Sequence, residues 1–264
     1  MGRAKDIRVD VISPRVATAF VKREHYSGKT PANTQLHLGV TLDDRLEGVL
    51  QFGPPLDRRK LLGLVRDTPW NGMCELNRMV FTEALPRNSE SRALGVAMRI
   101  LRRNAPSIEW VVSFADATQC GDGTIYRASG FVLTGIKANK NLARLPSGEV
   151  IHKLTVESNP TKTQPYADGR SMTDITGGRY DWNAYVHELG GEILTGHHLR
   201  YIYFLHPTAR ERLTVPEIPF TEIANQHATM YRGQPHAADP TGGTRHPAVD
   251  RRFDSDPAAS TTTT

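Results

Sequence analysis

The chain has 264 residues, of which 38% are hydrophobic, enough for one sizeable core and a small second lobe. Lysine and arginine exceed aspartate and glutamate by 33 − 28 = 5, and the pI of about 9.3 favours an anionic partner such as a nucleic acid. Two cysteines exclude a disulfide framework and a zinc site of four thiolates. The first ten residues are charged and no stretch has the roughly 18 apolar residues of a membrane-spanning helix, so we expect a cytoplasmic protein without a membrane span.

The N-terminal part of the chain predicts a strand, a helix and a hairpin. Polar and apolar residues alternate in the first strand, and Ser13-Pro14 is typical of the start of a helix. Asp43-Asp44 separates two β-prone stretches, which predicts a hairpin turn. In chain order, the expected elements are strand Lys5–Ile12, helix Ser13–Arg23, and strands Gln35–Leu42 and Arg45–Phe52.

Strands and helices alternate in the middle of the chain, and this alternation predicts an α/β (α+β) fold with at least one pair of parallel strands. The expected elements are strand Cys74–Thr82, helix Arg87–Arg103, strand Glu109–Ala115, helix Gly123–Ser129 and strand Phe131–Ile136.

The C-terminal part predicts further elements and then a tail. A single domain is expected over residues 1–225, with a core at 5–157 and C-terminal elements at 158–225. Gly, Pro, His, Thr and Asp dominate residues 226–264, which are predicted to be disordered because they bury too little apolar surface. The expected elements before the tail are strand Val150–Val156, loop Ser158–Gly178, helix Asp181–Leu189 and strand Leu199–Leu205.

Gly95 lies in the second turn of the helix predicted over Arg87–Arg103, where glycine costs about 1 kcal/mol relative to alanine. The N–H groups and dipole of a helix N-terminus attract anions, so a small residue at position 95 would let a phosphate approach, and Arg92 would add positive charge. Ser91 would lie beside that phosphate or cap the helix. Alternatively, Gly95 gives the helix clearance to pack on its strand.

The pattern Arg92-x-x-Gly95-x-Ala97 after a strand resembles the pyrophosphate-binding loop of the GNAT acetyltransferase superfamily, which holds coenzyme A. Tyr126, in Y-R-A-S-G-F, resembles the superfamily's last helix-to-strand junction, where a tyrosine faces the thioester and often protonates the departing thiolate. The resemblance implies a GNAT-like mixed central sheet with flanking helices and a C-terminal extension. It also implies acetyl-CoA or a related CoA thioester as cofactor.

The segments H-Y-S-G-K, E-L-N-R-M-V-F and F-A-D-A-T-Q-C-G-D-G-T-I-Y resemble the Mom family of bacteriophage DNA-modification proteins, over roughly residues 5–220. That family converts adenine in duplex DNA to N6-carbamoylmethyladenine, which protects phage DNA from restriction. The resemblance implies a transferase that acts on double-stranded DNA in the cytoplasm of the infected bacterial host. Acetyl-CoA and iron have both been implicated in the family's reaction, and the resemblance leaves the donor and the metal ligands open.

The two resemblances also imply the site residues. Asp116 would end a buried strand, where ligands meet α/β sheets, and would take a proton from the adenine amine, unless it serves as a turn residue. Arg78 would be paired in the interior or directed at a phosphate, because an unpaired buried guanidinium is costly. The predicted catalytic residues are His25, Tyr26, Asp116 and Tyr126, and the predicted cofactor-binding residues are Arg78, Ser91, Arg92, Gly95 and Ala97.

The other catalytic predictions also have structural alternatives. His25 and Tyr26 would stack on an extruded base or bind a metal, whereas a histidine at a helix end also complements the helix dipole. Tyr126 before Gly-Phe is equally compatible with a core position. The pair His197-His198 lacks the spacing of a metalloprotease zinc site, so we expect both at the surface or at an interface.

Chemistry on an adenine amine inside a duplex requires extrusion of the base. The aromatic residues Tyr180, Trp182 and Tyr185 would supply a wedge or form a small core. Two other functions remain open at this point: a GNAT N-acetyltransferase of a protein or small amine, and a non-catalytic DNA-binding antirestriction protein. Basic groups that would hold the DNA backbone are Arg58-Arg59-Lys60, Arg99 with Arg102-Arg103, and Lys137 with Lys140.

Overall fold

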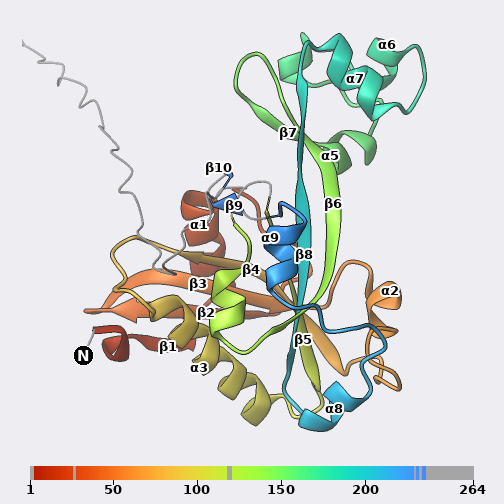
Figure 1. Cartoon of the computed structure of the whole chain (residues 1–264). Coiled ribbons are helices and arrows are strands. Elements are labelled where there is room, and N and C mark those ends of the chain that lie inside the picture. Colours follow the sequence, from red (N-terminus) through yellow and green to blue (C-terminus); the bar gives the residue numbers. More distant parts are fainter. Residues whose placement is uncertain (1–2, 26–27, 118–120, 229, 232–233, 236–264) are drawn as a thin grey trace, which may run out of the picture.

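The computed structural model describes residues 3–25, 28–117, 121–228, 230–231 and 234–235 (Figure 1). Its main feature is an eight-stranded sheet in the order β1-β2-β3-β4-β5-β8-β6-β7. The strands are β1 Arg8–Val11, β2 Leu36–Leu42, β3 Arg45–Gly53, β4 Met73–Phe81, β5 Trp110–Asp116, β6 Val132–Arg144, β7 Val150–His152 and β8 Glu192–Phe204. A separate pair joins β9 Met230–Tyr231 and β10 Gln234–Pro235.

Short helices accompany the sheet, and α3 is the longest of those described. They are α1 Pro14–Glu24, α2 Arg58–Leu62, α3 Ser89–Asn104, α4 Thr124–Ala128, α5 Lys153–Glu157, α6 Met172–Thr176, α7 Trp182–Glu188, α8 Pro207–Glu211 and α9 Thr221–Asn225. Two 3₁₀ turns span Arg3–Asp6 and Pro165–Ala167. Among the described residues, no helix has the length and apolar character that crossing a bilayer requires.

The sheet is mixed, which confirms the predicted α/β (α+β) class. Strands β4 and β5 are parallel, through the pairs Met73↔Trp110, Cys74↔Val111 and Glu75↔Val112. The other paired strands of the sheet are antiparallel. Strand β8 inserts between β5 and β6, so a strand from late in the chain lies beside the central parallel pair.

Local sequence signals explain the predicted N-terminal elements. Ser13 caps α1 by accepting a hydrogen bond from the Val16 N–H, and Pro14 occupies the first turn. Asp43 and Asp44 have φ angles of 49° and 61°, in the left-handed region that a tight hairpin turn between twisted strands requires. The predicted helix Ser13–Arg23 and the predicted hairpin are therefore confirmed.

Both faces of the sheet carry apolar cores. The first core lies under α3 and includes Leu94, Ala97 and Met98 of that helix. On the opposite face, α1 covers Val49 and Val80. Farther along that opposite face, Trp110, Val112 and Ile202 form a second core with Ala209 of α8 and the residues after α2. Asp116 lies on this opposite face, whereas Tyr126 belongs to the first core.

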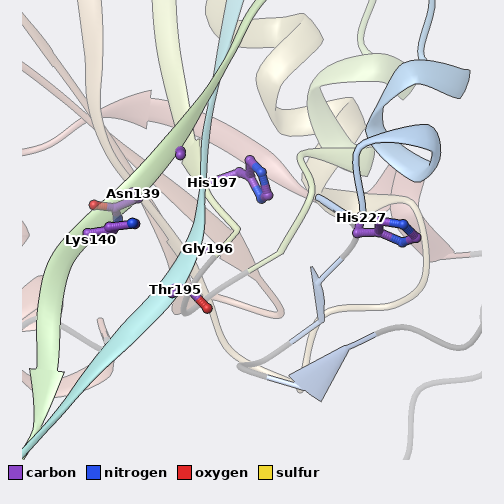
Figure 2. Close-up of a pocket in the computed structure, with 7 residues that line it drawn as sticks. Asn139, Lys140, Thr195, Gly196, His197 and His227 are labelled. Carbon is purple, nitrogen blue, oxygen red and sulfur yellow. The ribbon is translucent and has the colours of Figure 1, made fainter.

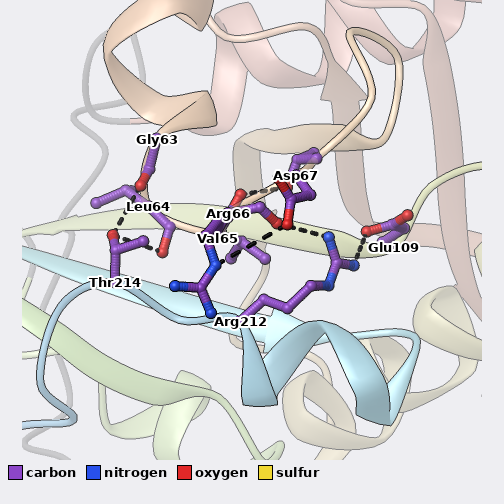
Figure 3. Close-up of polar contacts among 9 residues, drawn as sticks. Gly63, Leu64, Val65, Arg66, Asp67, Glu109, Arg212 and Thr214 are labelled. Atoms are coloured by element: carbon purple, nitrogen blue, oxygen red, sulfur yellow. Dashed lines mark hydrogen bonds and ion pairs between the residues drawn. The ribbon is translucent and has the colours of Figure 1, made fainter.

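The segment after α8 ties the second core to the loop after α2 (Figure 3). The Arg212 guanidinium forms a partly buried ion pair with Glu109 and donates to the Arg66 carbonyl at 2.6 Å. Thr214 Oγ1 donates to the Gly63 carbonyl at 2.7 Å, and the backbones of Val65 and Leu213 form an isolated bridge. These contacts hold two segments that are distant in sequence along one edge of the core.

A second lobe lies at the C-terminal end of β6 and the N-terminal end of β8 (Figure 1). It contains β7 and α5–α7 around its own core, in which Trp182 is 4% exposed and Tyr185 is fully buried. The wedge suggested for Trp182 and Tyr185 is therefore wrong, because both rings belong to this small core. The expected strand Val150–Val156 is correct only to His152, where α5 begins, and the expected loop Ser158–Gly178 contains α6.

The described chain continues past the predicted domain boundary at residue 225. Ala228 is fully buried in the first core, and β9 and β10 pair beyond it. Residues 236–264 of the predicted tail lie outside the described residues.

Candidate active site

The strands β4 and β5 separate after Glu75 and Val112, the last positions at which they pair. Ser113, the next residue of β5, is buried and its Oγ donates to the hydroxyl of Tyr126 at 2.9 Å. The Leu76 carbonyl, on β4, lies 3.5 Å from the same Oγ. Tyr126 of α4 therefore has its hydroxyl close to the point where the two strands separate, and its ring packs in the first core against Phe131 and Tyr201.

Asp116 ends β5 and lies beside two polar residues of the neighbouring strands. The Asn139 Nδ2 atom of β6 lies 3.4 Å from Asp116 Oδ1 and 2.8 Å from the Nε2 atom of His198. His198, on β8, faces Asp116 in the strand register, with 3.8 Å between His198 Nε2 and Asp116 Oδ2. The predicted position of Asp116 at the carboxyl end of a buried strand is therefore confirmed.

Asn139 joins the Asp116 carboxylate to the His198 imidazole. Asn139 Oδ1 accepts the N–H of Asn141 at 3.0 Å, so the amide nitrogen is the atom directed at Asp116 and His198. Asn139 is 2% exposed, so this contact is shielded from water.

His152, at the end of β7, brings the second lobe to this cluster. Its pKa is lowered, chiefly by burial, while the Asp116 charge opposes the shift and the charges of His198 and Lys29 add to it. His152 also fixes the start of α5, where its Nδ1 accepts the N–H of Leu154. Electrostatic coupling therefore links β5, β7, β8 and the loop that carries Lys29.

A β-bulge places Arg78 on the same face of the sheet. Gln51 of β3 pairs with Arg78 and the next residue, Phe52, pairs with Leu76, so Asn77 is the extra residue on β4. One extra residue reverses which side chains face the core. Arg78 consequently points away from the first core, and its Nε donates to the Lys29 carbonyl at 2.9 Å.

Arg78 lies close to His25 and Glu75 and affects both. Burial, together with the charge of Arg78, lowers the pKa of His25 to about 4, so this imidazole is neutral at pH 7. Burial raises the pKa of Glu75 to about 7 against the opposing effect of Arg78. Glu75 is therefore a carboxyl group that can gain or lose a proton near neutral pH.

The predicted cofactor residues of α3 line a separate groove of about 430 Å³. An added Cβ at Gly95 would meet only the end of the Arg99 side chain, at 3.9 Å, so packing on the strand does not require glycine. Ala97, by contrast, is fully buried in the first core. The groove is lined by Ala4, Lys5, Asn88, Ser91, Arg92, Gly95, Arg99 and Ala128.

A second hollow, of about 370 Å³, opens at the base of the second lobe (Figure 2). Figure 2 shows His197 projecting from β8 toward the segment after α9 that carries His227. The hollow shares Asn139 with the cluster around Asp116. The two adjacent histidines of β8 therefore belong to different environments.

The structure brings His25 close to Arg78, whereas Ser91, Arg92 and Gly95 lie together in the α3 groove. Tyr26 lies outside the described residues. Within the part of the chain that the structure describes, no three His, Cys, Asp or Glu side chains are arranged to hold a metal ion. The described residues therefore do not fit an iron site.

The sequence comparisons identify relatives of this chain. Residues 6–222 match the Mom protein family. The chain belongs to the Mom protein family. It is 36% identical over 211 residues to the methylcarbamoylase Mom of Escherichia phage Mu, and the match covers 80% of each chain.

Solved structures with a similar chain path are acetyltransferases. The spermidine/spermine N-acetyltransferase of Vibrio cholerae has a TM-score of 0.41 and 8% identity, over 79% of this chain and 98% of the other. The ribosomal-protein-S18-alanine N-acetyltransferase of Escherichia coli has a TM-score of 0.38 and 10% identity, over 76% of this chain and 94% of the other.

Sequence reasoning missed Glu75, Asn139, His152 and His198 as members of this Mom-family site. Glu75 carried a signal, since an acidic residue in the middle of an otherwise buried strand requires a reason. His198 was expected at the surface or at an interface; its side chain is 38% exposed, and it also belongs to the cluster. Its place follows from the insertion of β8 beside β5, which no local pattern indicates.

Proposed function

We propose that this chain is a phage DNA-modification enzyme. It is a transferase that converts adenine in double-stranded DNA to N6-carbamoylmethyladenine, so that phage DNA resists restriction in the cytoplasm of the infected host. The observation that carries the proposal is the match over 80% of both chains to a Mom-family protein named a methylcarbamoylase. The polar cluster around Asp116 supports it, because that cluster has the groups that the transfer needs.

Asp116 takes the proton that the adenine amine loses. When the new N6–C bond forms, one N6–H bond must break and the group displaced from the donor leaves with the bonding electron pair. Asn139 orients the carboxylate by donating a hydrogen bond to Oδ1, and His198 lies 3.8 Å from Oδ2. His198 accepts the proton from Asp116 and passes it to solvent, since its side chain is 38% exposed.

The α3 groove fits a CoA-type cofactor. Lys5, Arg92 and Arg99 provide positive charge, and the absent side chain of Gly95 leaves space above the helix for a phosphate. When bound, a CoA thioester would supply an activated acyl carbon, whereas the methylene carbon and the amide nitrogen of a carbamoylmethyl group require a further donor. Ala128 of the same groove and Tyr126 both belong to α4, which runs from the groove to the point where β4 and β5 separate. Tyr126 would be the acid that protonates a leaving thiolate.

Basic residues near Asp116 hold the DNA backbone. Lys137 pairs with His198 across β6 and β8, and both Lys137 and Lys140 are exposed. They would contact phosphates on either side of an extruded adenine, with an affinity that falls as salt rises. His25 and Tyr26 remain predicted contacts of that base.

The test is the mass of adenosine in DNA from cells that express the protein with a plasmid. The wild type adds the mass of one carbamoylmethyl group, and Asp116→Asn abolishes the gain. Asp122→Asn is the matched control, because the Asp122 side chain organises a turn by accepting hydrogen bonds from Thr124. Unmodified DNA from folded wild-type protein would contradict the proposal. Acetylation of proteins or small amines by the same protein would then favour an N-acetyltransferase. Tight DNA binding without any modification would favour a non-catalytic antirestriction protein.

A further inference from the structure

Phe114 is an exposed aromatic residue in a central strand. Strand β5 lies between β4 and β8, yet the Phe114 side chain is exposed and the residue has 39% of its surface accessible. Residues of central strands are usually covered on both faces in a mixed α/β sheet. An aromatic ring left open at such a position requires an explanation.

Alternation along β5 shows which face carries this ring. Trp110 and Val112 are fully buried in the second core, whereas Val111 and Ala115 belong to the first core under α3. Side chains two residues apart share a face, so Phe114 and Asp116 continue the face of Trp110 and Val112. The apolar cover on this face therefore ends at Val112, and Phe114 is the first uncovered residue before Asp116.

The neighbours of Phe114 leave its ring accessible. Arg200 pairs with Phe114 across β5 and β8. Its guanidinium is engaged by Thr134, with Nε donating to Oγ1 at 3.1 Å and one terminal nitrogen donating to the carbonyl at 2.7 Å. On the other side, the pairing of β4 with β5 ends before Phe114. The ring thus lies where β4 and β5 have separated, with 39% of the residue's surface accessible.

We propose that Phe114 is the platform on which the extruded adenine stacks while Asp116 receives its amine proton. This inference rests on the proposed function. Two residues along a strand advance about 7 Å, so a purine lying on the Phe114 ring can direct its amine edge at Asp116. Enzymes that modify bases stack the extruded base between aromatic or apolar groups, and each such stack is worth enough to be measurable.

Substitution of the ring tests this platform. The positions of modified adenines in DNA from cells that express the wild type first identify the preferred sequence context. Duplexes with that sequence then serve as substrates. Phe114→Leu should lower the single-turnover modification rate about 10- to 100-fold. Phe114→Tyr, which keeps the aromatic face, should stay within about threefold of the wild type. Trp70→Leu is the matched control, since Trp70 is an exposed aromatic residue that stacks with Arg58 in the loop after α2.

A binding measurement covers the case in which Phe114→Leu folds poorly. In Phe114→Trp, the added indole fluorescence should be quenched by a duplex with an unpaired target adenine, and much less by one with an abasic site there. Equal quenching by both duplexes, or an unchanged rate in folded Phe114→Leu, would overturn the platform. In both of these outcomes the wild type would still modify DNA. If the proposed function itself were wrong, the wild type would leave DNA unmodified, so the two failures can be told apart.

Discussion

Asp116 and His198 face each other across β5 and β8, and the Asn139 amide nitrogen contacts both. The carboxylate, imidazole and amide come from three adjacent strands of one sheet. Since strand positions are held by many backbone hydrogen bonds, this arrangement keeps the three groups aligned without a bound ligand. Preorganisation of this kind is what proton transfer from a weakly acidic amine requires.

The first prediction concerns His198 as a positioning and proton-relay residue. His198→Leu should lower the modification rate by roughly 10-fold or more, because residues that orient a reacting group have effects of that size. The acidic limb of the pH–rate profile should also move, since the Asp116 carboxylate would lose the titratable group that lies 3.8 Å away. His198→Gln, which keeps a polar group, should recover part of the rate.

His197→Leu is the control for that variant. His197 is the adjacent residue of β8 and lines the separate hollow at the base of the second lobe. Its removal should leave the pH–rate profile of adenine modification unchanged. Equal losses in the two variants, with the same profile, would show that His198 has only a structural role.

Much of the fold follows from local sequence patterns. Ser13-Pro14 fixes the start of α1, and the pair Asp43-Asp44 accounts for the hairpin between β2 and β3. Asp181 likewise caps α7 by accepting the Ala184 N–H. Such signals depend only on residues that are neighbours in the sequence, so these helix starts and this turn can be predicted without the structure.

The candidate site is harder to predict from the sequence, because it depends on pairing between strands that are distant along the chain. The bulge at Asn77 turns Arg78 toward Glu75 and His25, and its position is set by the register between β3 and β4. The α5 helix replaces the end of a predicted strand because His152 caps it and the second lobe packs around Val156. Neither the bulge nor the lobe has a local sequence signature.

The second prediction concerns the pH dependence of stability. The pKa of His25 falls from 6.5 to about 4 on folding, so the unfolded chain binds more protons there and stability decreases as pH drops from 6.5 toward 4. The pKa of Glu75 rises from 4.5 to about 7, so stability decreases as pH rises from 4.5 through 7. The two contributions oppose each other across the shared range.

Single variants should separate these contributions. Relative to the wild type, Glu75→Gln should gain stability with increasing pH, by roughly 1–3 kcal/mol at pH 8, because a buried charge is removed. His25→Gln should instead gain stability as pH drops below 6. Thermal unfolding at pH 5, 6, 7 and 8 measures both slopes. Parallel curves for the wild type and the two variants would contradict the assigned pKa directions.

The third prediction separates stability from cofactor binding at Gly95. Gly95→Ala should stabilise the protein by roughly 0.5–1 kcal/mol, because alanine favours the helix and its methyl group meets nothing closer than 3.9 Å. The same methyl group projects into the α3 groove and should weaken binding of coenzyme A. Thermal unfolding and calorimetric titration with coenzyme A measure the two effects.

Gly63→Ala provides the comparison for Gly95→Ala. Gly63 has φ of −66°, and nothing lies within 4 Å of an added Cβ. It is not a residue of the α3 groove, so coenzyme A should bind this variant as it binds the wild type. Unchanged affinity in Gly95→Ala as well would remove Gly95 from the phosphate-binding part of the groove.

The last prediction compares two arginines around the C-terminal end of α8. Arg212 pairs with Glu109, with side chains only 24% and 19% exposed, and also donates to the Arg66 carbonyl. Arg210 pairs with Glu217, with side chains 57% and 36% exposed. Removing Arg212 leaves a partly buried carboxylate without its cation, so Arg212→Met should destabilise the fold by roughly 1–3 kcal/mol. Arg210→Met should cost less than about 1 kcal/mol, because water screens an exposed pair. Urea unfolding of both variants gives the comparison, and equal losses would mean that the contacts in Figure 3 do not hold the segment after α8.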